Sequence, residues 1–177
     1  MKKVVILGAG NNKTLKLMPK GTEQDARDIT TIDIDPATRP DHVMDLNNIT
    51  RHWFPENSVD EFHAYEVLEH IGMQGNWRGF FHEFNCYWHF LKPGGVFLAS
   101  VPRWDGKWAW SDPGHTRVIS PGTLSFLSQK VYEKDVGRTT MTDYRAVYHG
   151  DFELIHSATD DDSFYFGLKA IKREPQP

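Results

Sequence analysis

The stretch Val4-Val5-Ile6-Leu7-Gly8-Ala9-Gly10 decides the expected fold. An apolar run that ends in closely spaced glycines is typical of a buried parallel strand followed by a tight turn. Glycine lets the backbone approach a ligand closely, and a helix N-terminus after the turn favours a negative group such as a carboxylate. Residues 4–10 therefore predict the first strand of an open α/β sheet, with a ligand-binding turn at its carboxyl end.

Three further apolar runs, at residues 29–34, 59–65 and 96–101, predict more buried strands. The clearest helix lies between the last two runs, because large apolar side chains recur there at helical spacing: Trp77, Phe80, Phe81, Phe84, Trp88 and Leu91. Its polar residues are expected mostly on the other side: Arg78, His82, Glu83, Asn85 and His89. We interpret the aromatic stripe as core rather than as a stacking surface for rings. This order of elements predicts right-handed crossovers and helices on both faces of the sheet.

The C-terminal part of the chain has a different pattern. Residues 151–158 and 163–171 are two extended segments that suit an antiparallel hairpin. Asp160, Asp161 and Asp162 join them, and we interpret these carboxylates as a solvated turn, with a metal site as the alternative. Between residues 102 and 150 the sequence indicates one helix, at residues 121–131 with Ser120 as its cap.

Composition limits the class of protein. With 177 residues the chain is long enough for one domain, which we place at residues 1–177. Apolar residues make up 39% and charged residues 25%, which excludes disordered and fibrous classes. The formal net charge of -4 gives no overall attraction to nucleic acid or to a membrane, although a local basic patch would not show in that total.

The cysteine content and the N-terminus bear on the expected location. Cys86 is the only cysteine in the sequence, so an intrachain disulfide is excluded. The apolar run that follows Lys2 and Lys3 is too short for a signal or membrane segment. We therefore expect a cytoplasmic protein that does not use a membrane as partner.

Asp33 ends the second apolar run and is a candidate ligand-binding carboxylate. At the end of such a strand a carboxylate can accept hydrogen bonds from both hydroxyls of a ribose. Nicotinamide enzymes and S-adenosylmethionine (SAM) enzymes both use this device. The alternative is that Asp33 or Asp35 is a turn or cap carboxylate before Pro36. A dinucleotide fingerprint would have a further glycine where the sequence has Lys13.

Taken in order, several segments resemble the class I SAM-dependent methyltransferase family. Each segment is common, but the ordered set is specific, and it spans residues 3–102 and, more loosely, the C-terminal hairpin. The segments are Val5-Ile6-Leu7-Gly8-Ala9-Gly10, Thr31-Ile32-Asp33-Ile34-Asp35-Pro36, Asp41-His42-Val43-Met44-Asp45-Leu46-Asn47-Asn48, Asn57-Ser58-Val59-Asp60-Glu61-Phe62, Val67-Leu68-Glu69-His70-Ile71 and Leu91-Lys92-Pro93-Gly94-Gly95.

The resemblance implies a Rossmann-like, doubly wound α/β fold. Its seven-stranded sheet would have the order 3-2-1-4-5-7-6, with strand 7 antiparallel. The implied activity is in-line transfer of the methyl group of S-adenosyl-L-methionine to an acceptor that the sequence does not identify: a small molecule, a sugar, a protein or a nucleic acid. The sequence also leaves the oligomeric state open.

The resemblance also implies a cofactor site. Its residues would be Gly8, Ala9, Gly10, Asn11, Asp33, Ile34, Asp45, Leu46, Ala64 and Tyr65. The glycine turn would contact the methionine end of SAM, Asp33 the ribose, Asp45 and the Leu46 backbone the adenine, and residues 64–65 would lie near the sulfonium. The sequence departs from the family pattern at Ile6, where an acidic residue is frequent, and in the stretch Asn11-Asn12-Lys13, which lacks a third glycine. Asparagine tolerates left-handed backbone and can bond a ligand.

Catalysis needs few groups in this reaction, because the sulfonium is already activated and no metal is required. An acceptor that loses a proton would need a base, and the candidates are Glu69, His70 and His115. A structural role for the Glu-His pair is the alternative. The substrate-facing region is expected at residues 103–150, where Trp104, Trp108 and Trp110 would line an acceptor pocket, form a lid or simply pack.

Two other functions share part of this pattern. A nicotinamide-dependent oxidoreductase would use the same turn and Asp33, but this function does not explain the Leu-Lys-Pro-Gly-Gly segment at residues 91–95. A protein of the same fold could also bind SAM or a partner without turnover, which the apolar Ile6 favours.

Overall fold

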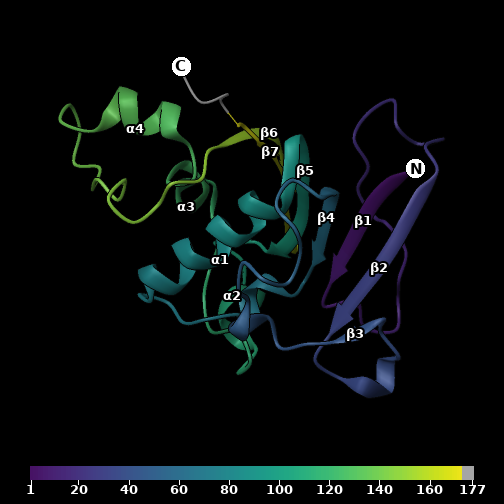
Figure 1. The fold of residues 1–177 in the computed structure, drawn as a ribbon. Coiled ribbons are helices and arrows are strands. Elements are labelled where there is room, and N and C mark those ends of the chain that lie inside the picture. The colour runs from purple at the N-terminus through teal and green to yellow at the C-terminus, as the bar shows by residue number, and fades with distance from the viewer. Residues whose placement is uncertain (173–177) are drawn as a thin grey trace.

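The computed structural model describes residues 1–172 and contains a seven-stranded sheet (Figure 1). The strands are β1 (Lys2–Leu7), β2 (Arg27–Asp33), β3 (His42–Val43), β4 (Val59–Tyr65), β5 (Leu91–Pro102), β6 (Phe152–Thr159) and β7 (Ser163–Ala170). Their order is β3-β2-β1-β4-β5-β7-β6. Neighbours from β3 to β5 are parallel, whereas β7 is antiparallel to β5 and β6. The predicted α/β class, strand order and antiparallel seventh strand are confirmed.

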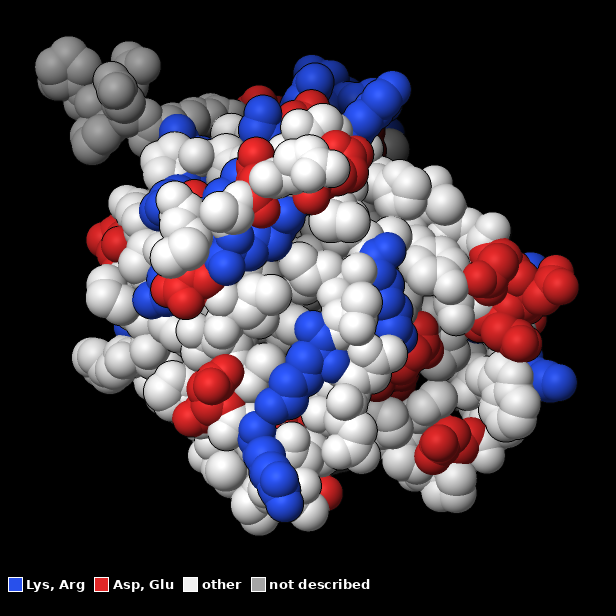
Figure 2. Space-filling view, turned by 90° about the vertical axis from the view of Figure 1, so that its right-hand side faces the viewer, with Lys and Arg blue, Asp and Glu red and all other residues white. Residues whose placement is uncertain are grey.

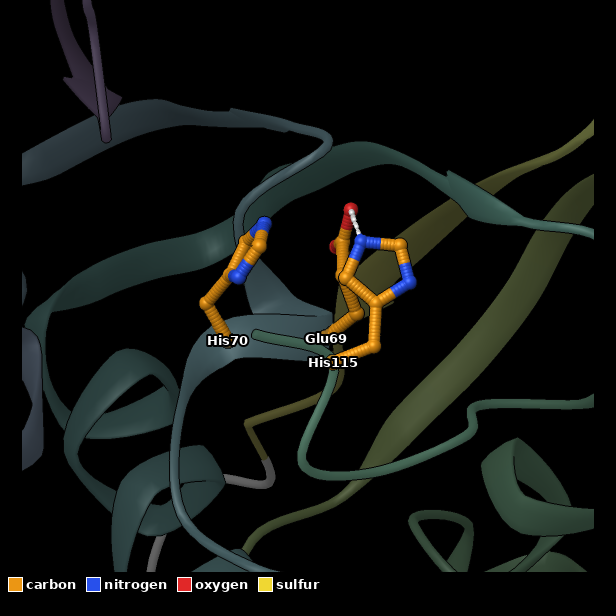
Figure 3. A group of neighbouring side chains, drawn as sticks. All are labelled: Glu69, His70 and His115. Atoms are coloured by element: carbon orange, nitrogen blue, oxygen red, sulfur yellow. Dashed lines mark ion pairs between the residues drawn. The ribbon is translucent and has the colours of Figure 1, made fainter. Parts of the chain in front are cut away.

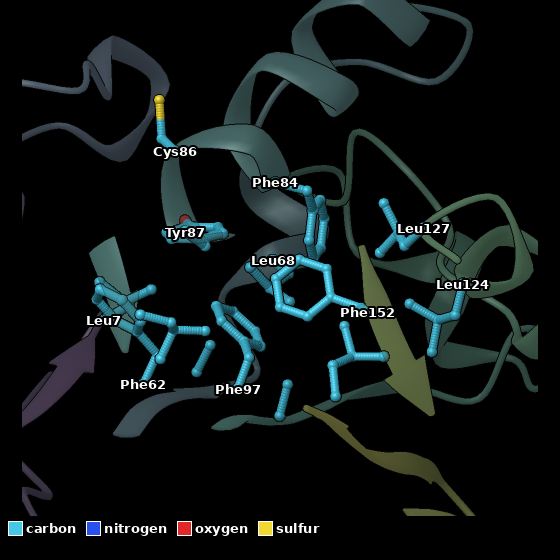
Figure 4. Packing of buried hydrophobic residues seen from close by; sticks show 14 of the residues in the cluster. Leu7, Phe62, Leu68, Phe84, Cys86, Tyr87, Phe97, Leu124, Leu127 and Phe152 are labelled. Atoms are coloured by element: carbon cyan, nitrogen blue, oxygen red, sulfur yellow. The ribbon is translucent and has the colours of Figure 1, made fainter. Parts of the chain in front are cut away.

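Helix α1 (Trp77–Phe90) covers one face of the central strands, as its aromatic stripe predicts. The ring of Tyr87 lies 4.8 Å from that of Phe97 on β5 and 5.5 Å from that of Phe62 on β4, between centroids. Figure 4 shows these rings in the main hydrophobic core, together with the fully buried Phe84. The stripe is therefore core, which is the interpretation favoured by the sequence.

Two polar residues of α1, Glu83 and Asn85, are buried. The expectation that the polar residues lie on the side of the helix away from the core is therefore wrong for these two. Glu83 is 3% exposed, and its carboxylate accepts two hydrogen bonds from the Arg117 guanidinium, at 2.6 and 3.1 Å. The Asn85 side-chain oxygen accepts the backbone N–H groups of His149 and Gly150. Buried polar groups are tolerated when they have such partners. Both sets of partners lie far along the chain, where helical periodicity gives no information.

The helix expected after the glycine turn is absent, because residues 8–26 form turns and irregular chain. The side chain of Asn12 accepts the Thr14 N–H at 3.0 Å, a local turn that competes with helix formation. Pro19 and Gly21 are also poor residues for a helix interior. Between β2 and β3 the described chain has only the 3₁₀ helix η1 (Pro36–Thr38). The expectation of helices on both faces of the sheet is therefore wrong in this half of the molecule.

A buried ionic network lies on the other face of β4, where a helix was expected. Glu61 is 1% exposed and pairs with Lys2 at 3.0 Å and with Arg27 at 3.3 Å. Its carboxylate also lies 3.2 Å from the ring Nε2 of the fully buried His63. Burial raises the pKa of a carboxyl group, but hydrogen bonds from His63, Lys2 and Arg27 outweigh burial and lower the pKa of Glu61 to about 2.

The described chain has three short helices after β5: α2 (Trp108–Ser111), α3 (Pro121–Ser125) and α4 (Gln129–Asp135). The single helix predicted at residues 121–131 is therefore wrong in its extent, although Ser120 does cap α3. The helix is interrupted at Leu127, whose carbonyl accepts the Phe152 N–H at 2.9 Å and the Tyr148 hydroxyl at 3.1 Å. Hydrogen bonds from β6 and from the chain just before it thus take the place of hydrogen bonds within a helix.

The C-terminal hairpin has the turn that its aspartates indicate. The Asp160 carboxylate accepts the backbone N–H groups of Asp162 and Ser163, at 3.0 and 2.8 Å. These bonds close the loop between β6 and β7. Within residues 1–172, no helix has the length and apolar character needed to cross a membrane.

Candidate functional site

A cleft of about 320 Å³ opens at the carboxyl edge of the sheet, where β1, β2 and β4 end beside one another. Its walls come from the glycine turn, from the chain between β2 and the 3₁₀ helix η2 (Leu46–Asn48), and from the chain around the 3₁₀ helix η3 (Leu68–His70). The lining residues are Gly8, Asp33, Ile34, Met44, Asp45, Leu46, Asn47, Val67, His70 and Ile71. Open α/β sheets bind their ligands at this edge.

The glycine turn and Asp33 form one hydrogen-bonded unit. Gly8 and Gly10 have φ angles of +58° and +53°, in the left-handed region that favours glycine. One carboxylate oxygen of Asp33 accepts the Gly10 N–H at 2.7 Å, and the other accepts the Asp35 N–H at 2.9 Å. Each oxygen has a second lone pair, so Asp33 can hold the turn and still accept hydrogen bonds from a ligand.

Residues 44–47 form a second wall of the cleft. The Met44 N–H donates to the Asp33 carbonyl at 2.9 Å, which ties this wall to β2. The Asp45 side chain caps η2 by accepting the Asn47 backbone N–H at 2.9 Å. Leu46 is buried beside it. A carboxylate acceptor and an apolar surface therefore lie next to each other in the same wall.

The remaining predicted cofactor residues lie near the cleft but are not among those that line it: Ala9, Gly10, Asn11, Ala64 and Tyr65. Ala64 is fully buried where β4 pairs with Leu7 of β1. The Tyr65 hydroxyl accepts the backbone N–H groups of Lys16 and Leu17, at 3.0 and 2.9 Å. Its side chain therefore anchors the irregular chain of residues 11–26.

Sequence reasoning missed four lining residues: Met44, Asn47, Val67 and Ile71. Met44 and Asn47 flank the predicted pair of residues 45–46, so proximity along one tight turn is the signal that could have found them. Val67 and Ile71 flank the predicted pair Glu69 and His70 in the same way, so the segment of residues 67–71 carried a similar signal.

The three candidate catalytic residues are brought together beside the cleft (Figure 3). Glu69 and His70 belong to η3, and His115 comes from the loop after α2. The His70 and His115 ring centroids are 4.8 Å apart. Glu69 Oε1 lies 4.0 Å from His115 Nε2. The chain segments around residues 69 and 116–117 are joined by backbone hydrogen bonds from Thr116 and Arg117 to the Glu69 carbonyl.

Glu69 has an unusual electrostatic environment. The side chain is buried, and its Oε2 atom has no hydrogen-bond partner. Burial raises the pKa of Glu69 to about 8, and the charges of Glu66 and Asp112 act in the same direction. A hydrogen bond from the backbone of Glu69 and, to a smaller extent, the charge of Arg117 partly offset this effect. The Arg117 guanidinium is already bonded to Glu83 and to the Leu68 carbonyl. The cluster thus contains a carboxyl group without a direct cationic partner.

The three tryptophans of the expected substrate region have different surroundings. Trp104 packs edge-on against Phe164 of β7, 5.2 Å away between ring centroids. Trp108 and Trp110 on α2 are 45% and 71% exposed. The Trp108 carbonyl accepts the His115 Nδ1–H at 2.8 Å, which links α2 to the cluster of candidate catalytic residues. Trp104 is therefore mainly a packing residue, whereas the other two present their indoles to solvent.

A second pocket of about 280 Å³ lies between α1 and the chain that follows Arg117. Its aromatic lining residues are Trp77, Phe80, Phe81, Phe126 and Tyr144. A smaller hollow of about 110 Å³ lies between the two, since it shares Leu46, Asn47 and Ile71 with the cleft and Met73 and Phe80 with the second pocket.

Basic side chains do not form a separate patch on the side of the molecule that carries β1 and β2. Figure 2 shows Lys and Arg side chains lying among Asp and Glu side chains on this face. An ion pair illustrates the mixture, Lys2 of β1 with Asp25, which lies just before β2. A mixed surface of this kind gives no large field of one sign to attract a polyanion.

Comparisons with known proteins bear on the fold. No protein-family profile and no curated protein sequence matches the chain. A SAM-dependent methyltransferase from Archaeoglobus fulgidus has a TM-score of 0.60 and 13% identity, over 95% of this chain and 86% of that one. The protein bound to the Trm112 methyltransferase activator in a Haloferax volcanii complex has a TM-score of 0.60 and 15% identity, over 97% and 83%.

A further solved structure, the cyclase SpnF, has a TM-score of 0.59 and 11% identity, over 96% of this chain and 75% of that one. The cyclase shows that similar architecture also serves a different reaction. Identities of this size establish the architecture, and the strand order with its antiparallel β7 agrees with it. The chain has the fold of the class I SAM-dependent methyltransferases.

Proposed function

We propose that this protein is a methyltransferase that uses S-adenosyl-L-methionine as methyl donor. One observation carries the proposal: the glycine turn, Asp33 and residues 44–47 converge on a single cleft at the carboxyl edge of a methyltransferase-type sheet. These segments come from three different strand ends, so their convergence is a property of the fold.

The lining of the cleft suits an adenosyl group. Leu46 and Ile71 offer apolar surface for a ring, and Asp45 offers an acceptor for an exocyclic amine. Asp33 keeps lone pairs for ribose hydroxyls. When bound, the cofactor would supply a methyl group that is already activated by the positive sulfonium. The protein then has to orient the acceptor and exclude water from it.

Residues 103–150 are the proposed acceptor-binding region. The exposed indoles of Trp108 and Trp110 are suited to stacking on a planar or sugar ring. His115 belongs to this region and is bonded to α2 through the Trp108 carbonyl, and His70 lines the cleft itself. Glu69, His70 and His115 therefore lie between the two proposed binding regions, where an acceptor hydroxyl or amine would lose its proton.

The two alternative functions receive different support. A nicotinamide oxidoreductase is disfavoured because the usual dinucleotide sheet is entirely parallel, whereas β7 is antiparallel here. A role without methyl transfer is favoured by Ile6, which is buried where many relatives of this fold carry an acidic residue, and by the cyclase among the structural neighbours.

Calorimetric titration with S-adenosylhomocysteine (SAH), SAM and NAD tests the proposal. We expect binding of SAH and SAM, no binding of NAD, and a rise in melting temperature with SAH, because a ligand selective for the folded state stabilises it. Transfer of a labelled methyl group to candidate acceptors then separates the methyltransferase from a binding protein. Absence of heat and of a melting shift at millimolar SAH would refute the proposal.

A further inference from the structure

Glu69, His70 and His115 have the arrangement of a metal-binding group. One ligand atom from each residue lies within 4.8 Å of the others, and among residues 1–172 no other group of three histidine, cysteine or carboxylate side chains has this property. Figure 3 shows the Glu69 carboxylate between the two imidazole rings. Two imidazoles and one carboxylate form a common ligand set for divalent transition metals.

Both rings are oriented from outside the cluster. The Nδ1–H of His70 donates to the Gly114 carbonyl at 3.0 Å, and the Nδ1–H of His115 donates to the Trp108 carbonyl at 2.8 Å. A backbone acceptor on Nδ1 fixes the tautomer and leaves the Nε2 lone pair as the ligand atom. This pattern is the usual outer-shell arrangement of metal-ligating histidines.

One carboxyl oxygen of Glu69 has no protein partner. Glu69 is 3% exposed, and its Oε2 atom accepts no hydrogen bond. The Oε1 atom lies 4.0 Å from His115 Nε2, which is beyond hydrogen-bond distance. A buried carboxyl oxygen is costly without a partner, so Oε2 is available as a ligand atom. A cation placed among the three side chains would bind this oxygen in place of the carboxyl proton.

We propose that Glu69, His70 and His115 bind a divalent transition-metal ion. The mixed nitrogen and oxygen ligands favour ions such as Zn²⁺, Co²⁺ or Fe²⁺ over Ca²⁺ and Mg²⁺, which prefer all-oxygen sites. Three protein ligands leave further coordination positions open. His70 also lines the cleft, so the ion would lie at the edge of the proposed cofactor site.

The location of the ion specifies the class of acceptor. In combination with the proposed methyl transfer, on which this step rests, an oxygen of the acceptor would occupy an open position of the ion. A metal ion would lower the pKa of a bound hydroxyl, so that its proton leaves to water and no side chain of the cluster has to act as the base. The deprotonated oxygen would then take the methyl group as the bond between the methyl carbon and the sulfonium sulfur breaks, and SAH would leave. The site therefore selects an acceptor with a hydroxyl group.

Titration of chelator-treated protein with Co²⁺, followed by calorimetry and visible absorption, tests the metal site. We expect one equivalent to bind and to give d–d absorption bands. His70→Ala and His115→Ala should each weaken Co²⁺ binding at least tenfold. His52→Ala is the matched control, because His52 is exposed and lies outside the cluster. His70 is exposed, so its replacement leaves the core unchanged.

SAH binding, measured on the same samples, keeps the two proposals separate. Retained SAH binding without stoichiometric Co²⁺ binding would overturn the metal site alone. Co²⁺ binding without SAH binding would overturn the proposed methyl transfer and leave the metal site in place. Equal weakening of Co²⁺ binding in the His52 and His115 variants would also overturn the site, because it would indicate adventitious binding to histidines.

Discussion

Gly8 packs against Val67 so closely that a Cβ atom on Gly8 would lie 2.2 Å from Val67 Cγ2. Gly8 follows β1, and Val67 follows β4, so this contact sets the distance between two walls of the cleft. Only glycine satisfies both this contact and the backbone conformation at position 8. The contact leads to the first prediction.

Gly8→Ala should lower the melting temperature and weaken SAH binding at least tenfold, because the new methyl group forces the cleft walls apart. Gly137→Ala is the matched control, since Gly137 also has a positive φ, of +77°, has no atom within 4 Å of an added Cβ and does not line the cleft. It should show only the conformational cost, about 1–2 kcal/mol. Equal effects of the two substitutions on thermal unfolding and calorimetric affinity would contradict the packing argument.

Asp33→Ala should weaken SAH binding by about 1–3 kcal/mol, because ribose hydroxyls lose a charged acceptor and the Gly10 N–H loses its partner. Asp35→Ala should have a smaller effect, because the Asp35 side chain caps η1 and does not line the cleft. Calorimetric affinities of both variants provide the measurement. A larger loss of affinity for Asp35→Ala would show that the ribose contacts Asp35 and not Asp33.

Glu61→Gln should lower the free energy of unfolding by about 3 kcal/mol at pH 7, because the buried carboxylate holds Lys2 and Arg27. The pKa of Glu61 is lowered to about 2 in the folded protein. Its contribution is therefore complete above the unfolded pKa, near 4.3, and is lost as the pH falls towards 2.

Urea unfolding of the two proteins between pH 7 and pH 2.5 measures this difference. Glu153→Gln on the exposed face of β6 is the control and should change the stability by less than about 0.5 kcal/mol. A gap between wild type and Glu61→Gln that stays constant with pH would show that the carboxylate charge is not the source of the stabilisation.

Trp108→Ala and Trp110→Ala should reduce turnover, once an acceptor is identified, while SAH affinity stays within about twofold. The reason is that both residues are exposed on α2, which is linked to the candidate catalytic cluster through the Trp108 carbonyl and His115, and neither lines the cleft. Tyr144→Ala is the informative comparison, because Tyr144 lines the second, aromatic pocket instead. Reduced turnover in Tyr144→Ala with normal turnover in both tryptophan variants would move the acceptor to that pocket. Trp104→Ala should mainly lower stability, since its ring packs on Phe164.

The sequence by itself determined the parallel part of the sheet and much of the cleft. Apolar runs that end in Gly8 and Asp33 locate strand ends, because a buried strand needs a continuous apolar segment and its terminus needs polar or flexible residues. The strand order was implied by the resemblance of the ordered short segments to the class I methyltransferase family, and the structure confirms it. Residues 45–46 were found because they belong to one of these segments.

Only the tertiary structure decided what replaces the helix after the glycine turn, and how the candidate catalytic residues meet. The Tyr65 hydroxyl holds the chain of residues 11–26 by accepting the Lys16 backbone N–H. These two residues are nearly fifty positions apart in the sequence. Glu69 and His115 approach because Thr116 and Arg117 donate hydrogen bonds to the Glu69 carbonyl. Such contacts depend on long-range geometry, whereas periodicity and turn chemistry report only on neighbours along the chain.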